Sequence, residues 1–366
     1  MTAPYGASVG PVPGPRESRI PSLDGLRATS IAFVLIGHGL SEFQRAHHVP
    51  GLGILVSYGE LGVRVFFCIS GFLITSLLMA ERRVSGRIDF AAFYLRRAFR
   101  ILPAYWAFLI AVALVGASGR LPCSLVDLRR ALLFVTDYLP VSWCFGHTWS
   151  LSVEEQFYLF WPLTLWLAGE RLALVLAVLL GLAAPIFRLT AATEAISGLH
   201  YQIDGLMIGV VLALLRERHG TRALRLYGGN VMATVSVLFV LVVSPAVTGL
   251  FAHRGLSLKL APVGSIWEVL AIGSIVLWAV HHAQTALGRA LNWGPIVHLG
   301  LMSYSLYLWQ QPFLFQGLSG AGPGRILVHA AAAFLCAELS YFLVERPFMA
   351  LRRRVLARRA ARSSAQ

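Results

Sequence analysis

Long runs of apolar residues follow one another along nearly the whole chain, separated by short polar and basic segments. An α-helix needs roughly 20 apolar residues to cross a bilayer, and several runs are shorter, so we expect tilted or broken helices among them. The pattern predicts an all-α polytopic membrane protein with about ten transmembrane helices, at 27–47, 60–80, 101–117, 149–168, 171–187, 203–216, 229–248, 262–281, 297–317 and 325–344.

The apolar stretch at 121–140 differs from these runs because Asp127, Arg129 and Arg130 interrupt it. Charged side chains are costly inside a bilayer. We therefore expect an interfacial or re-entrant helix here rather than an eleventh span.

The composition agrees with a membrane protein. The chain is 57% hydrophobic and 13% charged, with a mean hydropathy of +0.69, whereas soluble domains carry about 25% charged residues. The net charge of +14 does not indicate nucleic-acid binding, because the basic residues lie between apolar runs and form no groove-binding motif.

The distribution of these basic residues predicts the orientation. If both termini are cytoplasmic, most of the 31 Lys and Arg residues fall on the inner side, notably in 82–100, in 216–225 and from 346 to the end. This is the bias of the positive-inside rule. We expect a multi-pass protein of the cell (inner) membrane with an even number of spans.

Three segments follow from this division. Residues 1–20 are rich in Pro and Gly and predict a disordered cytoplasmic tail. Residues 21–348 form the ten-helix membrane domain. Residues 349–366 carry several Arg residues and predict a basic cytoplasmic tail lying against anionic lipid headgroups.

The four cysteines have no metal-binding spacing, and we expect no metal. Cys68 and Cys336 lie within spans as small apolar residues. Cys123 and Cys144 both fall in the long outer segment 118–148, where an oxidising exterior would allow a disulfide. The sequence leaves this pairing open.

Arg27 and His38 are the most informative pair. Eleven residues of helix make about three turns, so both side chains project from one face, with the imidazole about 16 Å deeper than the guanidinium. An ionisable group near the bilayer midplane is a functional candidate. We interpret His38 as a general base or acyl acceptor in a buried pocket. The alternative is a histidine that only hydrogen-bonds between helices. Gly37 and Gly39 flank it and indicate a close backbone approach.

A second cluster opens the fourth predicted span. Ser150, Glu154 and Tyr158 are spaced at i, i+4 and i+8 and share one helical face. Trp149 and Glu155 lie beside them. We expect Glu154, rather than Glu155, to face the interior. The alternative is that both acids simply favour the helix N-terminus electrostatically.

A third cluster is basic. Arg97 and Arg100 are i, i+3 neighbours at the inner side, and paired guanidinium groups suit phosphate recognition. The positive-inside rule alone accounts equally well for these two residues.

Taken in order, these motifs resemble those of the acyltransferase 3 family, integral-membrane enzymes that acylate hydroxyl groups of cell-envelope saccharides and some secondary metabolites. The resemblance covers about residues 20–348. It is carried by Leu-Asp24-Gly-Leu-Arg27 with His38, Phe66-Phe67-Cys-Ile-Ser70-Gly71-Phe72-Leu, Arg97 with Arg100, Trp149-Ser150-Leu-Ser-Val-Glu154-Glu155-Gln156-Phe-Tyr158, Ser303-Tyr304-Ser-Leu-Tyr307-Leu-Trp309, and Val-Glu345-Arg346-Pro347-Phe348.

The resemblance implies ten spans and a cytoplasmic acyl-CoA donor, with acetyl-CoA as the simplest. It implies a catalytic role for His38, supported by Arg27, and a required acid at Glu154. Arg97 and Arg100 would contact the donor phosphates. Two positions depart from the family: relatives often place a histidine where Gln310 stands, and an arginine where Gln202 stands.

The resulting hypothesis is acyl transfer to a saccharide or lipid-linked saccharide hydroxyl. His38 removes the hydroxyl proton or carries the acyl group. Glu154 orients the imidazole or binds sugar hydroxyls, and Trp149 and Tyr158 stack on the sugar ring. Ser150 and Glu155 are further candidate substrate contacts. A multi-pass transporter or flippase is the alternative, although no internal repeat of the kind that transporters carry is evident.

Overall fold

The computed structural model of the protein describes residues 20, 22–47, 49, 52–119, 121, 123–139, 141–191, 197–253, 262–314 and 323–364, which form helices, turns and loops and no strand. The predicted tail at 1–20 lies outside the described residues except for Ile20. The helices are α1 (Leu23–His47), α2 (Leu52–Ser85), α3 (Phe90–Ala117), α4 (Leu125–Leu132), α5 (Trp143–Gly146), α6 (Thr148–Thr190), α7 (Leu199–Ala223), α8 (Asn230–Leu238), η1 (Phe239–Val243), α9 (Ser244–His253), α10 (Pro262–His281), α11 (Ala286–Leu291), α12 (Gly294–Leu301), α13 (Ser303–Phe313), α14 (Pro323–Ser340), η4 (Tyr341–Glu345) and α15 (Arg346–Ser364).

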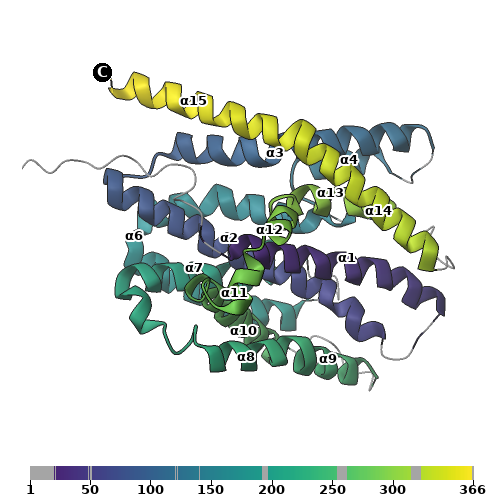
Figure 1. Ribbon diagram of the computed structural model, residues 1–366, viewed down its shortest axis with the longest axis horizontal. Helices are drawn as coiled ribbons and strands as arrows, with labels where there is room; N and C mark the ends of the chain where they lie inside the picture. The colour runs from purple at the N-terminus through teal and green to yellow at the C-terminus, as the bar shows by residue number, and fades with distance from the viewer. Residues whose placement is uncertain are drawn as a thin grey trace, which may run out of the picture.

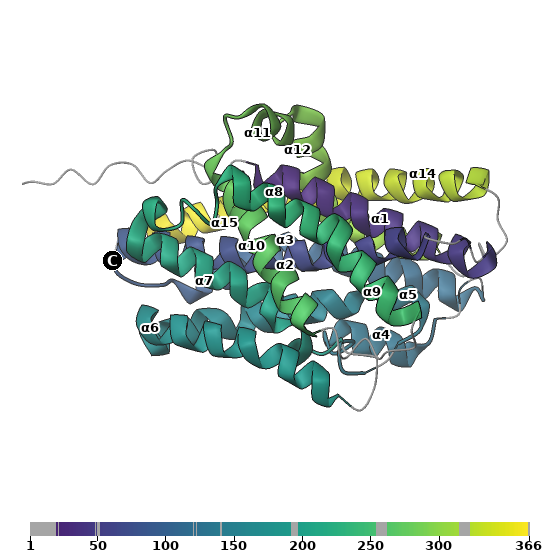
Figure 2. The same cartoon turned by 90° about the horizontal axis from the view of Figure 1, so that it is seen from below.

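Most of these helices lie along the long axis of the molecule (Figure 1). α1 and α2 lie in the middle of the bundle, α15 lies along one edge, and α8 and α9 lie along the opposite edge. Turning the molecule shows that α11 and α12 project from one side, whereas α6 lies on the other (Figure 2). The predicted all-α class is confirmed. Within the described residues, six helices are long and apolar enough to cross a membrane, and the count of ten stays a prediction.

Two predicted spans, 149–168 and 171–187, fall in the single assigned helix α6. Gly169 adopts φ 66° and ψ 175° between them, so the chain makes a sharp break there. Only glycine adopts such a conformation without strain. α6 is therefore two helices joined at Gly169, as the apolar pattern predicts.

Broken helices occur elsewhere as expected. The predicted span at 297–317 is divided at Met302 into α12 and α13. The span at 229–248 runs through α8, the π-helical turn η1 and into α9. In the predicted interfacial stretch 121–140, the described residues form one helix, the eight-residue α4, whose N-cap Ser124 accepts a hydrogen bond from the Asp127 amide at 3.0 Å.

Small residues let α2 pack closely on its neighbours. A Cβ atom at Gly71 would lie 2.0 Å from the Leu206 carbonyl oxygen in α7, and a Cβ at Gly209 would lie 2.1 Å from the Cys68 carbonyl oxygen. Any larger residue would therefore separate α2 from α7. Such contacts are typical of helices packed in membranes, where close backbone approach replaces the hydrophobic effect.

The predicted inner basic segments meet at one end of the bundle. Ion pairs join Arg82 of α2 to Glu170 in α6 (3.8 Å), and Arg83 to Glu217 in α7 (3.1 Å). Arg359 of α15 pairs with Asp89, just before α3, at 3.2 Å. α4 and α5 lie at the end of the bundle away from the C-terminus (Figure 2). This separation is what the predicted topology requires.

The basic segment 349–366 is helical as far as Ser364 and belongs to α15, which packs against α3. α14 continues into α15 through the π-helical turn η4, where the Arg346 amide donates to the carbonyl of Tyr341, five residues back. A π turn holds one residue more than an α turn and often marks a functional position. Here it places Glu345 in the interior, 1% exposed.

Candidate functional site

His38 lines an open pocket of about 310 Å³ between the helices, which we call the histidine cavity. Its imidazole projects from α1, and its Nδ1 atom lies 2.9 Å from the side-chain oxygen Oε1 of Gln310 in α13. The ring also contacts Trp143, with centroids 6.1 Å apart. The full lining is His38, Gly59, Glu60, Val63, His147, Trp149, Ser197, Gln202 and Tyr307.

The wall beside His38 is formed by backbone. A Cβ atom at Gly37 would lie 2.6 Å from both the Cα and N atoms of Gly59, so α1 and α2 touch at this point. The close approach expected from the flanking glycines is therefore confirmed for Gly37. Gly39 is different, because a Cβ there would meet only the Ile326 side chain at an ordinary 3.8 Å.

Arg27 lines a second, smaller cavity of about 50 Å³, which we call the arginine cavity. Glu154, Ser150 and Tyr304 are among its lining residues. Val63 and Tyr307 line both cavities, so the two meet at these side chains. Arg27 and His38 thus face the interior from the same helix, as their eleven-residue spacing predicts.

Glu154 is held by two hydroxyl groups. The Ser70 hydroxyl donates to its Oε1 atom at 3.0 Å, and the Tyr158 hydroxyl lies 3.1 Å from both Glu154 Oε2 and Ser70 Oγ. The predicted polar stripe therefore exists and faces inward. However, Glu154 lines the arginine cavity. The side chain that contacts the His38 imidazole is Gln310, whereas the sequence had suggested Glu154 as one candidate for that contact.

The two arginines of α3 have different environments. Arg97 stacks its guanidinium over the Tyr158 ring, 5.4 Å from the centroid. Arg100 donates to the Glu345 carboxylate at 2.9 Å and to the Leu301 carbonyl at 3.2 Å. Since Glu345 is fully buried, Arg100 has a structural partner, and removing one member of such a pair costs about 3–5 kcal/mol.

The guanidinium groups near the arginine cavity have spare donors. The Nε atoms of Arg27 and Arg97 are buried and have no hydrogen-bond partner in the part of the chain that the structure describes. Unpaired buried donors are costly, so an anionic partner would stabilise them.

The remaining candidates are divided between the cavities. Trp149 lines the histidine cavity and contacts Phe67 edge to face. Ser150 lines the arginine cavity, and its hydroxyl lies 2.5 Å from that of Tyr307. Glu155 lines neither; it is half-buried and interacts electrostatically with Glu154 and Arg97. Of the two acids, Glu154 is the one that lines a cavity, which agrees with the expected inward face of the stripe.

Three residues near the cavities escaped the sequence reasoning. The His147 ring is 3% exposed, lines the histidine cavity and contacts Tyr307. Glu60 lines the same cavity and pairs with Arg64 one turn along α2. Arg352 of α15 is half-buried and interacts electrostatically with the α3 arginines. His147 stands in the same motif as Trp149, which could have identified it.

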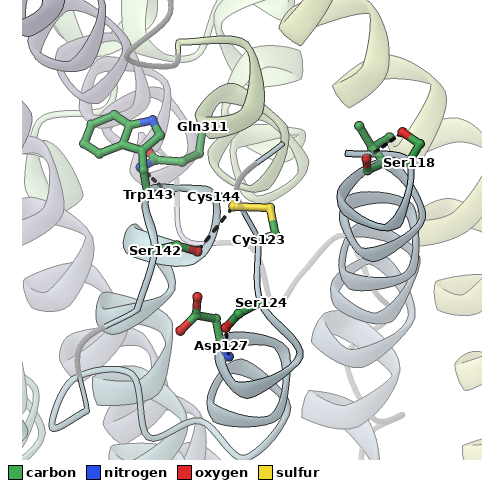
Figure 3. Close-up of a disulfide and its surroundings, with 9 residues drawn as sticks. Ser118, Cys123, Ser124, Asp127, Ser142, Trp143, Cys144 and Gln311 are labelled. Carbon is green, nitrogen blue, oxygen red and sulfur yellow. Dashed lines mark hydrogen bonds between the residues drawn. A yellow bond between two sulfur atoms is a disulfide. The ribbon is translucent and has the colours of Figure 1, made fainter. Parts of the chain in front are cut away.

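Cys123 and Cys144 form a disulfide (Figure 3). This settles the pairing that the sequence left open. Next to it, the Trp143 carbonyl accepts a hydrogen bond from Gln311 Nε2 at 2.9 Å, and the Ser142 hydroxyl lies 3.4 Å from the Cys144 sulfur. The Gln311 hydrogen bond joins the segment just before α6 to α13, the helix that carries Gln310, and the disulfide links the same segment to Cys123.

These features define a class of protein. Long apolar helices line two neighbouring pockets, one with an imidazole and one with a guanidinium and a carboxylate in its wall, which makes this a multi-pass helical membrane protein with a candidate site between its helices. Among the described residues, no group of three His, Cys, Asp or Glu side chains is placed to hold a metal ion.

The family follows from comparison. The family model for an acyltransferase domain matches residues 20–336, and the chain belongs to this family of acyltransferases. The resemblance drawn from the motifs is thereby confirmed, and acyl transfer is favoured over transport.

Two relatives place the chain more closely. It is 24% identical over 371 residues to the peptidoglycan O-acetyltransferase OatA of Listeria monocytogenes serovar 1/2a, covering 90% of this chain and 55% of the relative. It is 26% identical over 358 residues to the O-acetyltransferase OatA of Staphylococcus aureus strain NCTC 8325, covering 90% of this chain and 57% of the relative. The chain thus spans a little more than half the length of these relatives. No solved structure matches it.

Proposed function

We propose that the protein transfers an acyl group, acetyl in the simplest case, from cytoplasmic acyl-CoA to a hydroxyl of a cell-envelope saccharide. In this proposal the chain crosses the cell membrane ten times with both termini in the cytoplasm. The observation that supports it is that the two cavities share Val63 and Tyr307 in their walls. A donor and an acceptor that enter from opposite ends would meet there, beside His38.

The donor side is the arginine end. The unpaired guanidinium donors of Arg27 and Arg97 would bind the phosphates of CoA, because guanidinium groups bind phosphate through paired hydrogen bonds. Arg100 interacts electrostatically with Arg97, and the Glu345 carboxylate balances its charge. Glu154 lines the same cavity as Arg27 and interacts with its charge.

The acceptor side is the histidine cavity. Its volume of about 310 Å³ is at the small end of the range typical of ligand pockets. Trp149 offers an aromatic face to a sugar ring, and Gln202 and Ser197 offer neutral polar groups to its hydroxyls. The peptidoglycan acceptor in the name of the Listeria relative is the first candidate.

The chemistry requires one base. His38 removes the proton of the saccharide hydroxyl as its oxygen attacks the thioester carbonyl. The carbon–sulfur bond then breaks, and the CoA thiolate takes the proton from the imidazolium. The alternative route places the acyl group on the imidazole first and transfers it to the hydroxyl in a second step.

The direct test replaces the native gene by one encoding His38→Ala. We expect the O-acyl content of the envelope saccharides, measured by mass spectrometry, to fall to the level of a gene deletion. General-base catalysis contributes on the order of 10²–10⁴ in rate. His282→Ala, at a histidine stacked on Trp278 outside both cavities, is the matched control. Unchanged O-acylation in the His38 variant at normal protein level would overturn the proposal.

A further inference from the structure

A chain of side-chain amides connects His38 to the disulfide-linked segment. His38 Nδ1 lies 2.9 Å from Gln310 Oε1, and Gln310 Nε2 donates to Gln311 Oε1 at 3.2 Å. Gln311 Nε2 in turn donates to the backbone carbonyl of Trp143 at 2.9 Å. Figure 3 shows Gln311 reaching this carbonyl directly beside the Cys123–Cys144 disulfide.

The donor-to-acceptor direction of these hydrogen bonds is fixed at the Trp143 end. A backbone carbonyl only accepts hydrogen bonds, so Gln311 must turn its NH₂ group toward Trp143. The Gln311 side-chain oxygen then faces Gln310, which must donate a hydrogen bond to it from its own NH₂ group. The Gln310 oxygen is thereby turned toward His38, and an oxygen there requires an N–H on Nδ1.

Both glutamines are held where they can impose this order. Gln310 is 0% exposed and Gln311 is 2% exposed, so neither can exchange its partners for water. Reversing either amide would place two oxygens or two NH₂ groups face to face in a buried setting, which is unfavourable. The disulfide holds the Trp143 carbonyl that sets the direction.

We propose that Gln310 and Gln311 are positioning residues that fix the tautomer of His38. They keep the proton of the neutral imidazole on Nδ1, which leaves the Nε2 lone pair free to act as the base. This inference rests on the proposed function, because it assigns to His38 the role given above. An amide acceptor orients the imidazole without adding a charge.

The first test compares two substitutions of similar size at one buried position. Gln310→Met removes the acceptor, and we expect kcat to fall on the order of 10–100-fold, the range found for groups that orient metal-binding histidines. The KM values for acetyl-CoA and for a peptidoglycan oligosaccharide should stay unchanged. Gln310→Glu keeps an acceptor for Nδ1–H and, when protonated, a donor for Gln311, so it should recover most of kcat.

A kcat that is higher in Gln310→Glu than in Gln310→Met distinguishes a positioning role of Gln310 from a packing role. If Gln310 only filled space, the apolar Met would be tolerated better than a buried acid. Wild-type kcat in Gln310→Met, or a Gln310→Glu enzyme no better than the Met variant, would overturn the inference. Gln311→Met should lower kcat less than Gln310→Met, because Gln310 keeps its contact with His38 but loses its fixed direction.

Failure of the inference and failure of the proposed function give different results. If His38→Ala loses activity while Gln310→Met keeps full activity, only the inference about Gln310 is overturned. If His38→Ala keeps full activity, the assignment of His38 as the base, and with it the proposed function, is overturned. The ¹⁵N NMR spectrum of the histidine-labelled wild-type protein provides a readout without turnover. The resonances lost in His38→Ala should belong to a protonated Nδ1 and an unprotonated Nε2. The reverse assignment would also overturn the inference.

Discussion

The arginine cavity and the histidine cavity share two wall residues and differ in almost everything else. The first is small and contains a guanidinium and a carboxylate, Arg27 and Glu154. The second is about six times larger and is lined mainly by imidazole, aromatic, amide and hydroxyl groups, with Glu60 as its charged member. In the proposed function, the arginine end binds the phosphorylated donor and the histidine cavity binds the polyhydroxylated acceptor.

The difference indicates a division of labour along α1. A single helix presents Arg27 to one cavity and His38 to the other, and the contact between Gly37 and Gly59 fixes it against α2 near the imidazole. If the cavities hold different substrates, a change in one should affect the KM of one substrate and leave the other unchanged.

The largest such effect should come from Arg97→Lys. Lysine keeps the charge but lacks the planar fork of donors, and it cannot stack in the same way on Tyr158. We expect the KM for acetyl-CoA to rise about tenfold, corresponding to the loss of about 1.4 kcal/mol of binding, with the acceptor KM unchanged. Initial rates at varied donor concentration measure this.

The neighbouring Arg96 is the matched control for that substitution, because it pairs with Glu81 at 2.6 Å instead. Arg96→Lys should leave the donor KM unchanged. An unaltered donor KM in Arg97→Lys would remove Arg97 from phosphate recognition.

A smaller effect, on the KM of the acceptor instead of the donor, is expected for Trp149→Leu in the histidine cavity. Loss of an aromatic face costs about 1 kcal/mol, which corresponds to an acceptor KM raised about fivefold, with the donor KM unchanged. Trp166→Leu changes an exposed Trp of the same helix and serves as the control. A rise in the donor KM of Trp149→Leu would show that the cavities do not separate the substrates.

The smallest effect is expected for Arg352→Gln. This half-buried residue interacts electrostatically with Arg97 and Arg100, so its loss should raise the donor KM about twofold, the scale of a weak charge interaction. Arg354→Gln, at an exposed position on the same helix, should have no effect. Equal donor KM values in the two variants would exclude α15 from the donor site.

Local features were predictable from the sequence. The helices follow from apolar runs, and the break at Gly169 follows from the polar gap between two such runs. The Arg27–His38 pair and the Ser150–Glu154–Tyr158 stripe depend only on helical periodicity, so their shared faces needed no knowledge of the fold. The structure places all five of these side chains in the interior.

Pairings between distant helices were not predictable. Arg100 and Glu345 are 245 positions apart, and Gln310 lies 272 positions from His38. Periodicity says which face a residue occupies but not which helix covers it. For this reason Glu154 was considered as the group orienting His38, although the covering helix supplies Gln310 instead.

The π turn at Tyr341–Glu345 makes the end of the chain sensitive to its length. The extra residue turns everything after it by about 100° relative to a regular α-helix. A chain one residue shorter in this turn would gain ordinary helix geometry, yet Glu345 would rotate away from Arg100, and α15 would offer α3 a different face. Spacing, as much as residue type, therefore maintains the joint between α3 and the C-terminal helix.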